Sequence, residues 1–516
     1  MRGKMRKGSG VNQRRAGAVL SYVALVVNAV TTFIYTPLIL SFLTTSEYGV
    51  YQLIGSIIAY LGVMDMGLST TLSRFYVEAR VKEDKAHVEN LLAMAAVIYG
   101  VLTALSVVVG IAFDLLLPML FGQSFTPGEL ELAHQMMLLV LLNCVVVLPG
   151  NYFLAVINAN ERFVFARTLR IARYLLQFAG VIAVLYLGQG AIGVLAVQVA
   201  LNFLADVAYI FYYRGKLHVR AKLHHWDKRL LLHIFSFSGY ILLNMVFDQI
   251  FWKTGQVVLG AVVNATAVGV YGIATQLITS GYMEVSTGVT SVFLPKLTVM
   301  SARTDDMTKI NDLFNRIGHI QALLVWGICA GFTSIGREFI YVWAGPEYEE
   351  AFWATLFIML GLTVSLVQNL GISVLQAKDK QGFRAIIYIV IAVLDLLVSI
   401  PVSAEFGVIG CAVTAAVFLF IGTGPIMNWY YHTKIGIDIP KFWHEVIPVL
   451  IPAVLTASAT LGFSALTRLG PSYGSILIKC LFFVVVYFAL CWKWFFTDYE
   501  RGIIRGTFHK FSRKKA

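Results

Sequence analysis

Two charged side chains, Asp248 and Lys253, interrupt an otherwise mostly apolar stretch between residues 231 and 259. If this stretch crosses a membrane as a helix, each charge near the bilayer centre costs roughly 2.5–3.5 kcal/mol, so a charge kept there is a candidate for function. A lysine ammonium binds phosphate oxygens well, and a buried carboxylate can titrate. The two residue types therefore indicate a site for an anionic group, for a coupling ion, or for both.

Helical geometry places the polar residues of this stretch on one half of a helix. At about 100° per residue, that half carries Asn244, Asp248, Gln249, Lys253 and Gln256, and the other half is apolar. We interpret this division as the lining of a water-filled cavity. The alternative is a pair of salt bridges to neighbouring helices, because Asp248 and Lys253, about 140° apart, are badly placed to pair with each other.

Polar residues of other apolar stretches extend the predicted site. Asn28 lies on a polar face of residues 16–43, and Gln276 and Glu284 share a face of residues 266–295. We predict that Asn28 and Gln276 contact substrate, and that Asp248 or Glu284 couples proton or sodium movement to transport. Interhelical hydrogen bonding is the favoured interpretation of the other buried polar candidates, and a helix-end charge is the simpler one for Asp65. Those other candidates are Gln177, Asn202, Asp206, Gln368, Asn369 and Asp395.

The elements that must position these residues are membrane-spanning helices. The chain has 516 residues, of which 58% are hydrophobic and 13% charged, about half the charged share of a soluble domain. This composition excludes a disordered chain, a disulfide scaffold and an ordinary soluble enzyme. A helix needs about 20 apolar residues to cross a bilayer. The stretches that qualify predict an all-α polytopic membrane protein with 14 transmembrane helices, at 16–43, 47–73, 87–117, 131–157, 164–187, 191–213, 231–259, 266–295, 314–336, 351–376, 383–401, 407–431, 444–466 and 475–496.

The basic residues are distributed unevenly between the two sides of the predicted membrane. Of the 40 Lys and Arg residues, 36 fall before the first stretch, after an even-numbered stretch, or at the end of the chain. By the positive-inside rule that side is the cytoplasm, so both termini are predicted to be cytoplasmic. Topology thus explains the net charge of +12, and no nucleic-acid partner is needed to account for it.

Short motifs recur at an offset of 217 to 220 residues. Gly49-Val50-Tyr51 returns as Gly269-Val270-Tyr271, Ala159–Arg162 resembles Ala377–Lys380, and Gly190–Gly193 matches Gly407–Gly410. We therefore predict two parallel six-helix repeats that carry a substrate between them and alternate its access by rocking. The predicted organisation is a basic cytoplasmic tail (1–15), an N-terminal six-helix bundle (16–213), a cytoplasmic linker (214–230), a C-terminal six-helix bundle (231–431), and helices 13 and 14 with a basic tail (432–516).

The sequence contains no enzyme signature. The motifs HExxH, GxxxxGK[ST] and GxSxG are absent, and no GxGxxG follows a strand. The five cysteines lie in apolar stretches without a CxxC pair, which is typical of small core residues. We expect no enzymatic activity, no metal site and no cofactor.

Two stretches of the chain resemble a known family. Tyr48–Leu53 and Asp65–Phe75 are similar to the second span of bacterial polysaccharide flippases (O-antigen/exopolysaccharide, Wzx-like) of the multidrug/oligosaccharidyl-lipid/polysaccharide (MOP) exporter superfamily. The Ala-Asn-Glu-Arg turn at 159–162, the Gly-x-x-Gly turn at 190–193 and the layout of six, six and two helices also resemble that family.

The resemblance implies a fold and an activity. The fold would be a V-shaped pair of six-helix bundles around a central cavity, with the two extra helices at the C-terminus. The activity would be movement of a polyprenyl-pyrophosphate-linked oligosaccharide from the cytoplasmic to the outer leaflet of the bacterial plasma (inner) membrane, for lipopolysaccharide or exopolysaccharide biosynthesis. Lys253 would suit the pyrophosphate, and Gln249 and Gln256 the sugar hydroxyls. The implied partners are the lipid-linked oligosaccharide, membrane lipids and the polysaccharide polymerase or export machinery.

Three alternatives stay open. A lipid II flippase would also have fourteen helices, whereas a multidrug or cation antiporter of the same superfamily commonly has twelve. A membrane glycan polymerase or ligase often carries a large external catalytic loop. The longest external segment predicted here, at about 336–350, is short and acidic, which argues against such an enzyme.

Overall fold

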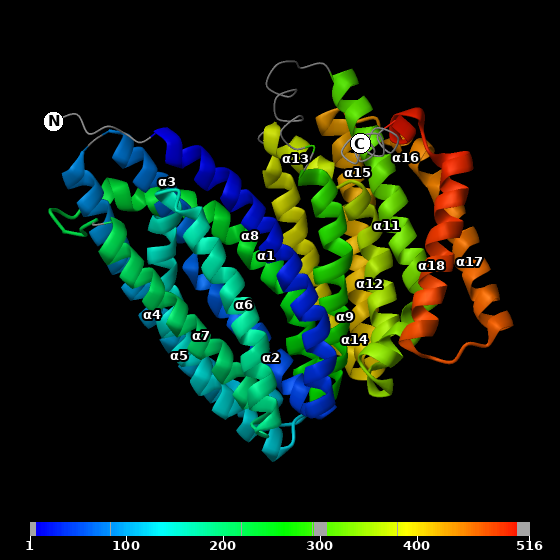
Figure 1. The fold of residues 1–516 in the computed structure, drawn as a ribbon, viewed down its shortest axis with the longest axis horizontal. Helices are drawn as coiled ribbons and strands as arrows, with labels where there is room; N and C mark the ends of the chain where they lie inside the picture. Colours follow the sequence, from blue (N-terminus) through cyan, green and yellow to red (C-terminus); the bar gives the residue numbers. More distant parts are fainter. Residues whose placement is uncertain are drawn as a thin grey trace. The chain divides into compact units, whose positions relative to one another are not determined.

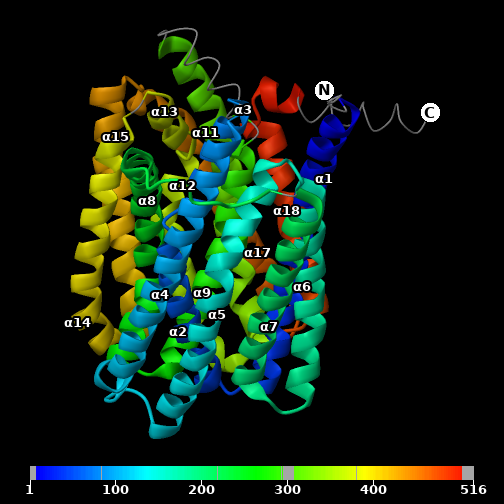
Figure 2. The same cartoon turned by 90° about the vertical axis from the view of Figure 1, so that its left-hand side faces the viewer.

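The computed structural model of the chain describes residues 7–82, 84–217, 219–291, 293, 307–378 and 380–502, and these ranges are built from helices with no β-strand (Figures 1 and 2). The all-helical class predicted from the apolar stretches is thereby confirmed. The chain forms two compact units, Met1–Gly269 (unit 1) and Val270–Ala516 (unit 2). Unit 1 ends beyond the predicted linker at 214–230, because the following helix packs onto unit 1. The predicted domain limits remain a prediction.

Unit 1 is a bundle of long helices. The pairs α1 with α6, α4 with α5, and α6 with α7 pack along much of their length, and α6 and α7 lie side by side in Figure 2. The helices are α1 (Lys7–Phe42), α2 (Thr45–Gly62), the 3₁₀ turn η1 (Val63–Asp65), α3 (Leu68–Val81), α4 (Lys85–Phe121), α5 (Pro127–Ala159), α6 (Phe163–Tyr186), α7 (Gly190–Tyr212), the π turn η2 (Tyr213–Leu217), α8 (Lys228–Val262) and the first residues of α9 (Ala265–Leu277).

Polar residues at the helix starts explain several of these boundaries. The Thr44 hydroxyl accepts a hydrogen bond from the backbone N–H of Glu47 and so caps α2. Thr126 and Glu129 form a reciprocal capping box at the start of α5, with Pro127 at its first position. Glu47 in turn accepts a hydrogen bond of 2.8 Å from the Ala191 N–H, next to Gly190 with its left-handed φ of 53°. These contacts fix the turns between successive helices.

The predicted second span is broken in its middle. Met66 and Gly67 have φ values of 51° and 65°, so η1 ends there and α3 starts in a new direction. Only glycine fits at position 67, because an added Cβ would also overlap Cγ2 of Ile241 on α8. The break therefore fixes both the bend of this span and its close approach to α8.

Unit 2 contains the remaining helices, and α17 and α18 near its C-terminal end lie side by side (Figure 1). They are the rest of α9, the π turn η3 (Ile278–Tyr282), a helical segment at 283–291, α11 (Met307–Trp343), the 3₁₀ turn η4 (Pro346–Tyr348), α12 (Glu350–Val367), α13 (Leu370–Ala377), α14 (Gln381–Ile421), η5 (Gly422–Ile426), α15 (Met427–Tyr430), η6 (Tyr431–Ile435), α16 (Ile439–Val446), η7 (Ile447–Val449), α17 (Leu450–Thr467), α18 (Tyr473–Leu490) and η8 (Cys491–Phe495).

Eleven helical stretches of the described residues are long and apolar enough to cross a membrane. One of them, Gln381–Ile435, has 55 residues and is interrupted at Gly407, whose φ of 58° and ψ of −138° are not helical. This break separates the predicted spans 383–401 and 407–431. The 35-residue α8 is also long enough to cross, and its residues 230–247 include no Asp, Glu, Lys or Arg. The protein is thus a multi-pass membrane protein, and the count of fourteen stays a prediction.

Candidate functional site

Helix α8 carries most of the residues predicted to contact substrate. Its 35 residues rise about 52 Å, more than the roughly 30 Å of a hydrocarbon core. Asp227 caps its start and accepts hydrogen bonds from the backbone N–H groups of Leu230, at 3.1 Å, and Arg229, at 2.9 Å. These bonds hold the pKa of the Asp227 carboxyl below its usual value. The helix packs against α2, α3 and α4 within unit 1.

Two side-chain contacts fix α8 against α2. The Ser56 hydroxyl donates to Oε1 of Gln256, and the Tyr60 hydroxyl lies 2.7 Å from Oγ1 of Thr254. Gln256 is only 1% exposed. The structure therefore directs Gln256, one of the predicted sugar contacts, toward a neighbouring helix of its own unit.

Lys253 and its predicted neighbours on α8 are less buried than Gln256. Asp248 is exposed, and Gln249 and Lys253 are half-buried. Among the described residues of unit 1, no carboxylate lies within 4.0 Å of the Lys253 ammonium, so Asp248 is not its ion-pair partner there. The side chain of Asn244 lies outside the described part of the structure. The face thus offers a cation, a carboxylate and an amide, which suit a ligand with phosphate and hydroxyl groups.

Asn28 belongs to a different hollow. A cavity of about 90 Å³ lies between α1 and α6. It is lined by Asn28, Thr31, Thr32, Tyr35, Tyr174, Gln177 and Phe178. A volume of this size holds a few waters, whereas sites for small organic ligands are typically 300 Å³ or more. The residues that line this cavity belong to α1 and α6, and none of them belongs to α8.

The remaining predicted residues belong to unit 2. Gln276 is half-buried on α9, and Glu284 is exposed in the helical segment 283–291, just after the π turn η3. A π turn of this kind often marks a functional position in a helix. Among the described residues, no group of three or more His, Cys, Asp or Glu side chains is arranged to hold a metal ion.

Two buried polar networks of unit 1 join helices through partners that were not predicted from the sequence. Asp65, only 7% exposed, accepts hydrogen bonds from Ser69 at 2.8 Å, Tyr99 at 3.1 Å and Asn151 at 3.2 Å. It does lie at a helix end, as interpreted, but it also joins three helices. The sequence does contain a signal for the helix break at this position: a charged residue lies directly before a Met-Gly pair within an apolar stretch.

The second network joins α5, α6 and α7. Arg173 donates to Oδ1 of Asn202 at 2.7 Å, and Asn202 donates to Oδ1 of Asn143 at 2.8 Å. Asn202 was assigned to interhelical hydrogen bonding, and the structure confirms that role. The partners Arg173 and Asn143 lie on separate helices, so no sequence spacing reveals them.

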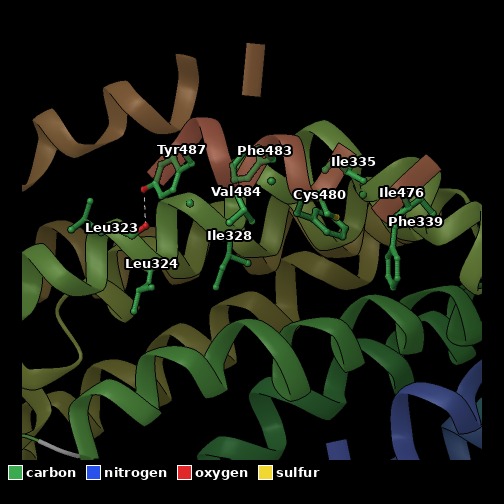
Figure 3. A pocket seen from close by; sticks show the side chains of 14 residues that line it. Leu323, Leu324, Ile328, Ile335, Phe339, Ile476, Cys480, Phe483, Val484 and Tyr487 are labelled. Atoms are coloured by element: carbon green, nitrogen blue, oxygen red, sulfur yellow. Dashed lines mark hydrogen bonds between the residues drawn. The ribbon is translucent and has the colours of Figure 1, made fainter. Parts of the chain in front are cut away.

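Unit 2 contains an apolar groove of about 430 Å³ between α11 and α18 (Figure 3). The residues that line it include Gly327 and Gly331, which have no side chain, and the aromatic residues Phe339, Phe483 and Tyr487. The Tyr487 hydroxyl turns away from it and donates to the Leu323 carbonyl at 2.7 Å. Lined in this way, the groove suits a hydrocarbon chain and offers nothing to a charged group.

These features define a class of protein: a multi-pass helical membrane protein with polar residues inside its helical units. The fold is similar to that of the lipid II flippase MurJ in its inward closed conformation, with a TM-score of 0.70 and 14% identity over 92% of this chain and 97% of that one. It is also similar to an inward-facing multidrug resistance MATE transporter of the MOP superfamily, with a TM-score of 0.58 and 13% identity over 80% of this chain and 98% of that one.

The sequence places the chain more narrowly. It belongs to the polysaccharide biosynthesis protein family, whose profile matches residues 39–353. The chain is 21% identical over 257 residues to the probable low-salt glycan biosynthesis flippase Agl15 of Haloferax volcanii, covering 49% of this chain and 52% of that protein. It is 20% identical over 231 residues to the teichuronic acid biosynthesis protein TuaB of Bacillus subtilis, covering 45% and 47%. The chain thus spans about half the length of these curated relatives in the matched regions.

Proposed function

We propose that this protein flips a polyprenyl-pyrophosphate-linked oligosaccharide from the cytoplasmic to the outer leaflet of a bacterial plasma membrane, for surface polysaccharide biosynthesis. The observation that carries the proposal is the family match over residues 39–353, which includes all of α8. Both relatives bear names that refer to the synthesis of a glycan, and one is named a flippase.

The chemistry of unit 1 supports an anionic, hydroxyl-rich substrate. Lys253 presents a half-buried ammonium on a helix long enough to span the bilayer, with Gln249 and Asp248 on the same half of the helix. A pyrophosphate would compensate the ammonium, and the amide and carboxylate would bind sugar hydroxyls. The apolar groove of unit 2 adds a surface compatible with the polyprenyl chain.

Alternating access between two parallel repeats is part of the proposal. Two pairs of motif-equivalent glycines support the repeat. Gly190 and Gly407 both have a positive φ, of 53° and 58°. Gly190 starts α7, and Gly407 interrupts α14. Gly49 and Gly269 lie in van der Waals contact with each other.

The proposed orientation has both termini and the 214–230 segment in the cytoplasm. The partition of 36 of 40 basic residues to one side supports it. A single cysteine introduced at exposed Lys222, in a variant without the native cysteines, should react with an impermeant maleimide only after the membrane is opened. Labelling of intact cells would reverse the orientation.

Coupling to a proton or sodium gradient is proposed through Asp248 or Glu284. Both side chains are exposed in the structure of their own unit, so water and ions can reach them there. Transport by Asp248→Asn and Glu284→Gln variants should respond less to an imposed gradient than transport by the unchanged protein. Transport that ignores both gradients in the unchanged protein would remove this role.

Deleting the gene distinguishes the proposal from its alternatives in the same superfamily. The expected result is loss of a surface polysaccharide and accumulation of its lipid-linked precursor on the cytoplasmic leaflet. Accumulated lipid II would instead identify a lipid II flippase. Normal glycans with increased drug sensitivity would identify a multidrug antiporter, and an unpolymerised glycan on the outer leaflet would identify a polymerase or ligase.

A further inference from the structure

A second charged hollow lies in unit 1, away from the polar face of α8. It has a volume of about 570 Å³ and opens between the end of α3, the start of α4 and the segment that follows η2. It is lined by Tyr76, Arg80, Asp84, Lys85, Val88, Glu89, Val219 and Arg220. Three of these side chains are basic and two are acidic, so the ligand that fits depends on which charges are already satisfied.

Both carboxylates of the hollow are bound by the protein. Oδ1 of Asp84 accepts a hydrogen bond of 3.0 Å from the His87 backbone N–H, because Asp84 is the N-cap of α4. Oε2 of Glu89 lies 3.0 Å from Nε2 of His224. Both carboxylates therefore make contacts that hold the walls of the hollow.

The basic side chains of the hollow have fewer hydrogen-bond and ion-pair partners in the protein than the two carboxylates. Arg80 donates from Nη1 to Oδ1 of Asn160 at 2.7 Å, and the Asn160 amide donates to the Tyr76 hydroxyl at 3.1 Å. This chain of bonds orients the Arg80 guanidinium with other N–H groups still available, since it has five. Among the described residues, neither Lys85 nor Arg220 has a carboxylate within 4.0 Å. Within the part of the chain that the structure describes, the three basic side chains of the hollow thus form no ion pair with a carboxylate.

The segment that closes the hollow is held in place by a buried side chain. Asn90, only 1% exposed, accepts backbone hydrogen bonds from His224 at 2.9 Å and His225 at 3.1 Å. The Lys222 N–H adds a bond of 3.2 Å to the Glu89 carbonyl. These bonds hold Val219 and Arg220 against α4. The walls of the hollow are therefore fixed by hydrogen bonds within unit 1.

We propose that this hollow binds a phosphate-bearing anion through Arg80, Lys85 and Arg220, with the Tyr76 hydroxyl available to it. Guanidinium groups bind phosphate oxygens in pairs and an ammonium binds them as a point charge, so this set matches one phosphate or a diphosphate. The site lies on the side that the sequence assigns to the cytoplasm, where both anionic lipid headgroups and soluble phosphates occur. It is separate from the residues of the proposed substrate site, and the proposal does not depend on the proposed function.

Thermal unfolding of the full-length protein in a neutral detergent tests the site. Ligand binding raises the melting temperature by mass action, which yields an apparent Kd. One arm titrates dioleoyl phosphatidylglycerol, with dioleoyl phosphatidylcholine as the uncharged lipid, and the other arm titrates inorganic pyrophosphate. The test variant is Lys85→Gln/Arg220→Gln. The control is Lys222→Gln/Lys228→Gln, which removes the same charge from exposed residues that do not line the hollow.

We expect a large loss of anion affinity that is confined to variants of the residues lining the hollow. The test variant should bind the anion roughly 25-fold more weakly, at about fivefold for each basic side chain, and the control should stay within about twofold of the unchanged protein. Lys85→Arg/Arg220→Lys keeps both charges and should retain binding, which separates lost contacts from misfolding. Stabilisation by phosphatidylglycerol alone identifies a lipid headgroup, and stabilisation by pyrophosphate identifies a soluble phosphate. Stabilisation by neither anion, an unaltered Kd in the test variant, or equal losses in test and control would overturn the proposal.

Discussion

Gly49 and Gly269 lie directly against each other: a Cβ placed on Gly269 would be 3.3 Å from the Gly49 nitrogen and 3.4 Å from its Cα. These are the two glycines that the Gly-Val-Tyr motif pairs at an offset of 220 residues. A Cβ on Gly49 would overlap the carbonyl oxygen of Ala265 at the start of α9. Gly49 of α2 and Gly269 of α9 thus lie close together within unit 1, and Gly49 leaves no room for a side chain.

Gly49→Ala should destabilise the protein by about 1–3 kcal/mol, because the backbone of α9 must move to admit the methyl group. Thermal unfolding in detergent measures the effect. Gly55→Ala is the matched control, since it lies on the same helix with nothing within 4 Å of its added Cβ. Alanine is also the better helix former, so the control should be neutral or slightly stabilising. Equal melting temperatures for the two variants would contradict the close contact.

Lys479 and Glu338 form an ion pair between α18 and α11, in which the Lys479 side chain is buried and the Glu338 side chain is partly exposed. Nζ of Lys479 lies 2.6 and 2.7 Å from the two carboxylate oxygens, and Lys479 is 1% exposed. Lys479→Met should cost about 1.5–3 kcal/mol, because Glu338, whose side chain is 31% exposed, loses its charged hydrogen-bond partner. Adding Glu338→Gln should restore much of the loss in thermal stability.

The neighbouring ion pair provides the control for this effect. Arg337 pairs with Glu349 at the surface, where the Arg337 side chain is 67% exposed. Arg337→Gln should therefore change stability by no more than about 1 kcal/mol. A Lys479→Met variant as stable as Arg337→Gln would show that the Lys479–Glu338 pair does not hold α18 to α11.

Tyr99→Phe removes one hydrogen bond from the buried Asp65 carboxylate and should cost about 1.5–3 kcal/mol. Asp65→Ala should cost more, since it leaves Ser69, Asn151 and Tyr99 without their acceptor. Tyr186→Phe, at a tyrosine that is 74% exposed, is the control and should have little effect. Chemical unfolding of the purified protein compares the three. No loss in Asp65→Ala would reduce Asp65 to an ordinary helix-end charge.

Lys253→Arg should retain much of the transport, whereas Lys253→Gln and Lys253→Ala should lose roughly tenfold or more, because a charged hydrogen bond to phosphate contributes about 1.5–3 kcal/mol. The measurement is glycan export in cells, normalised to the amount of protein in the membrane. Lys228→Gln, an exposed residue at the start of the same helix, is the control.

The double variant separates the two interpretations of Lys253. If the ammonium only balances an acid such as Asp248, Lys253→Ala combined with Asp248→Ala should restore export, since no charge is then left unpaired. Headgroup binding predicts no such rescue. Normal export by Lys253→Ala alone would remove the residue from the substrate site.

Helix positions were predictable from the sequence because membrane solvation acts locally. An apolar stretch must be helical in lipid, and the Gly407 break fell where two predicted spans were separated. The polar half of α8 was also visible, because helical periodicity alone reveals it. Such signals depend only on residues close together in the chain.

Partners were not predictable, because they depend on contacts between helices. Gln256 was grouped with Lys253 by its angle on the helix, but Ser56 of α2, 200 residues earlier, accounts for its burial. Asn28 was grouped with the same site, and it lines a separate cavity beside α6. The hollow at Arg220 was not predicted, because its basic residues had been assigned to the charge distribution expected from membrane topology.

The central claim is translocation of a lipid-linked glycan, and reconstitution measures it directly. The purified protein is placed in liposomes that contain a fluorescent polyprenyl-pyrophosphate oligosaccharide, and an impermeant glycosidase reports which leaflet holds the glycan. We predict that the protein moves the inner-leaflet pool to the outer leaflet, and that Lys253→Ala at the same density does so at a tenth of the rate or less. An inner-leaflet pool that stays protected in the presence of correctly folded protein would contradict the account.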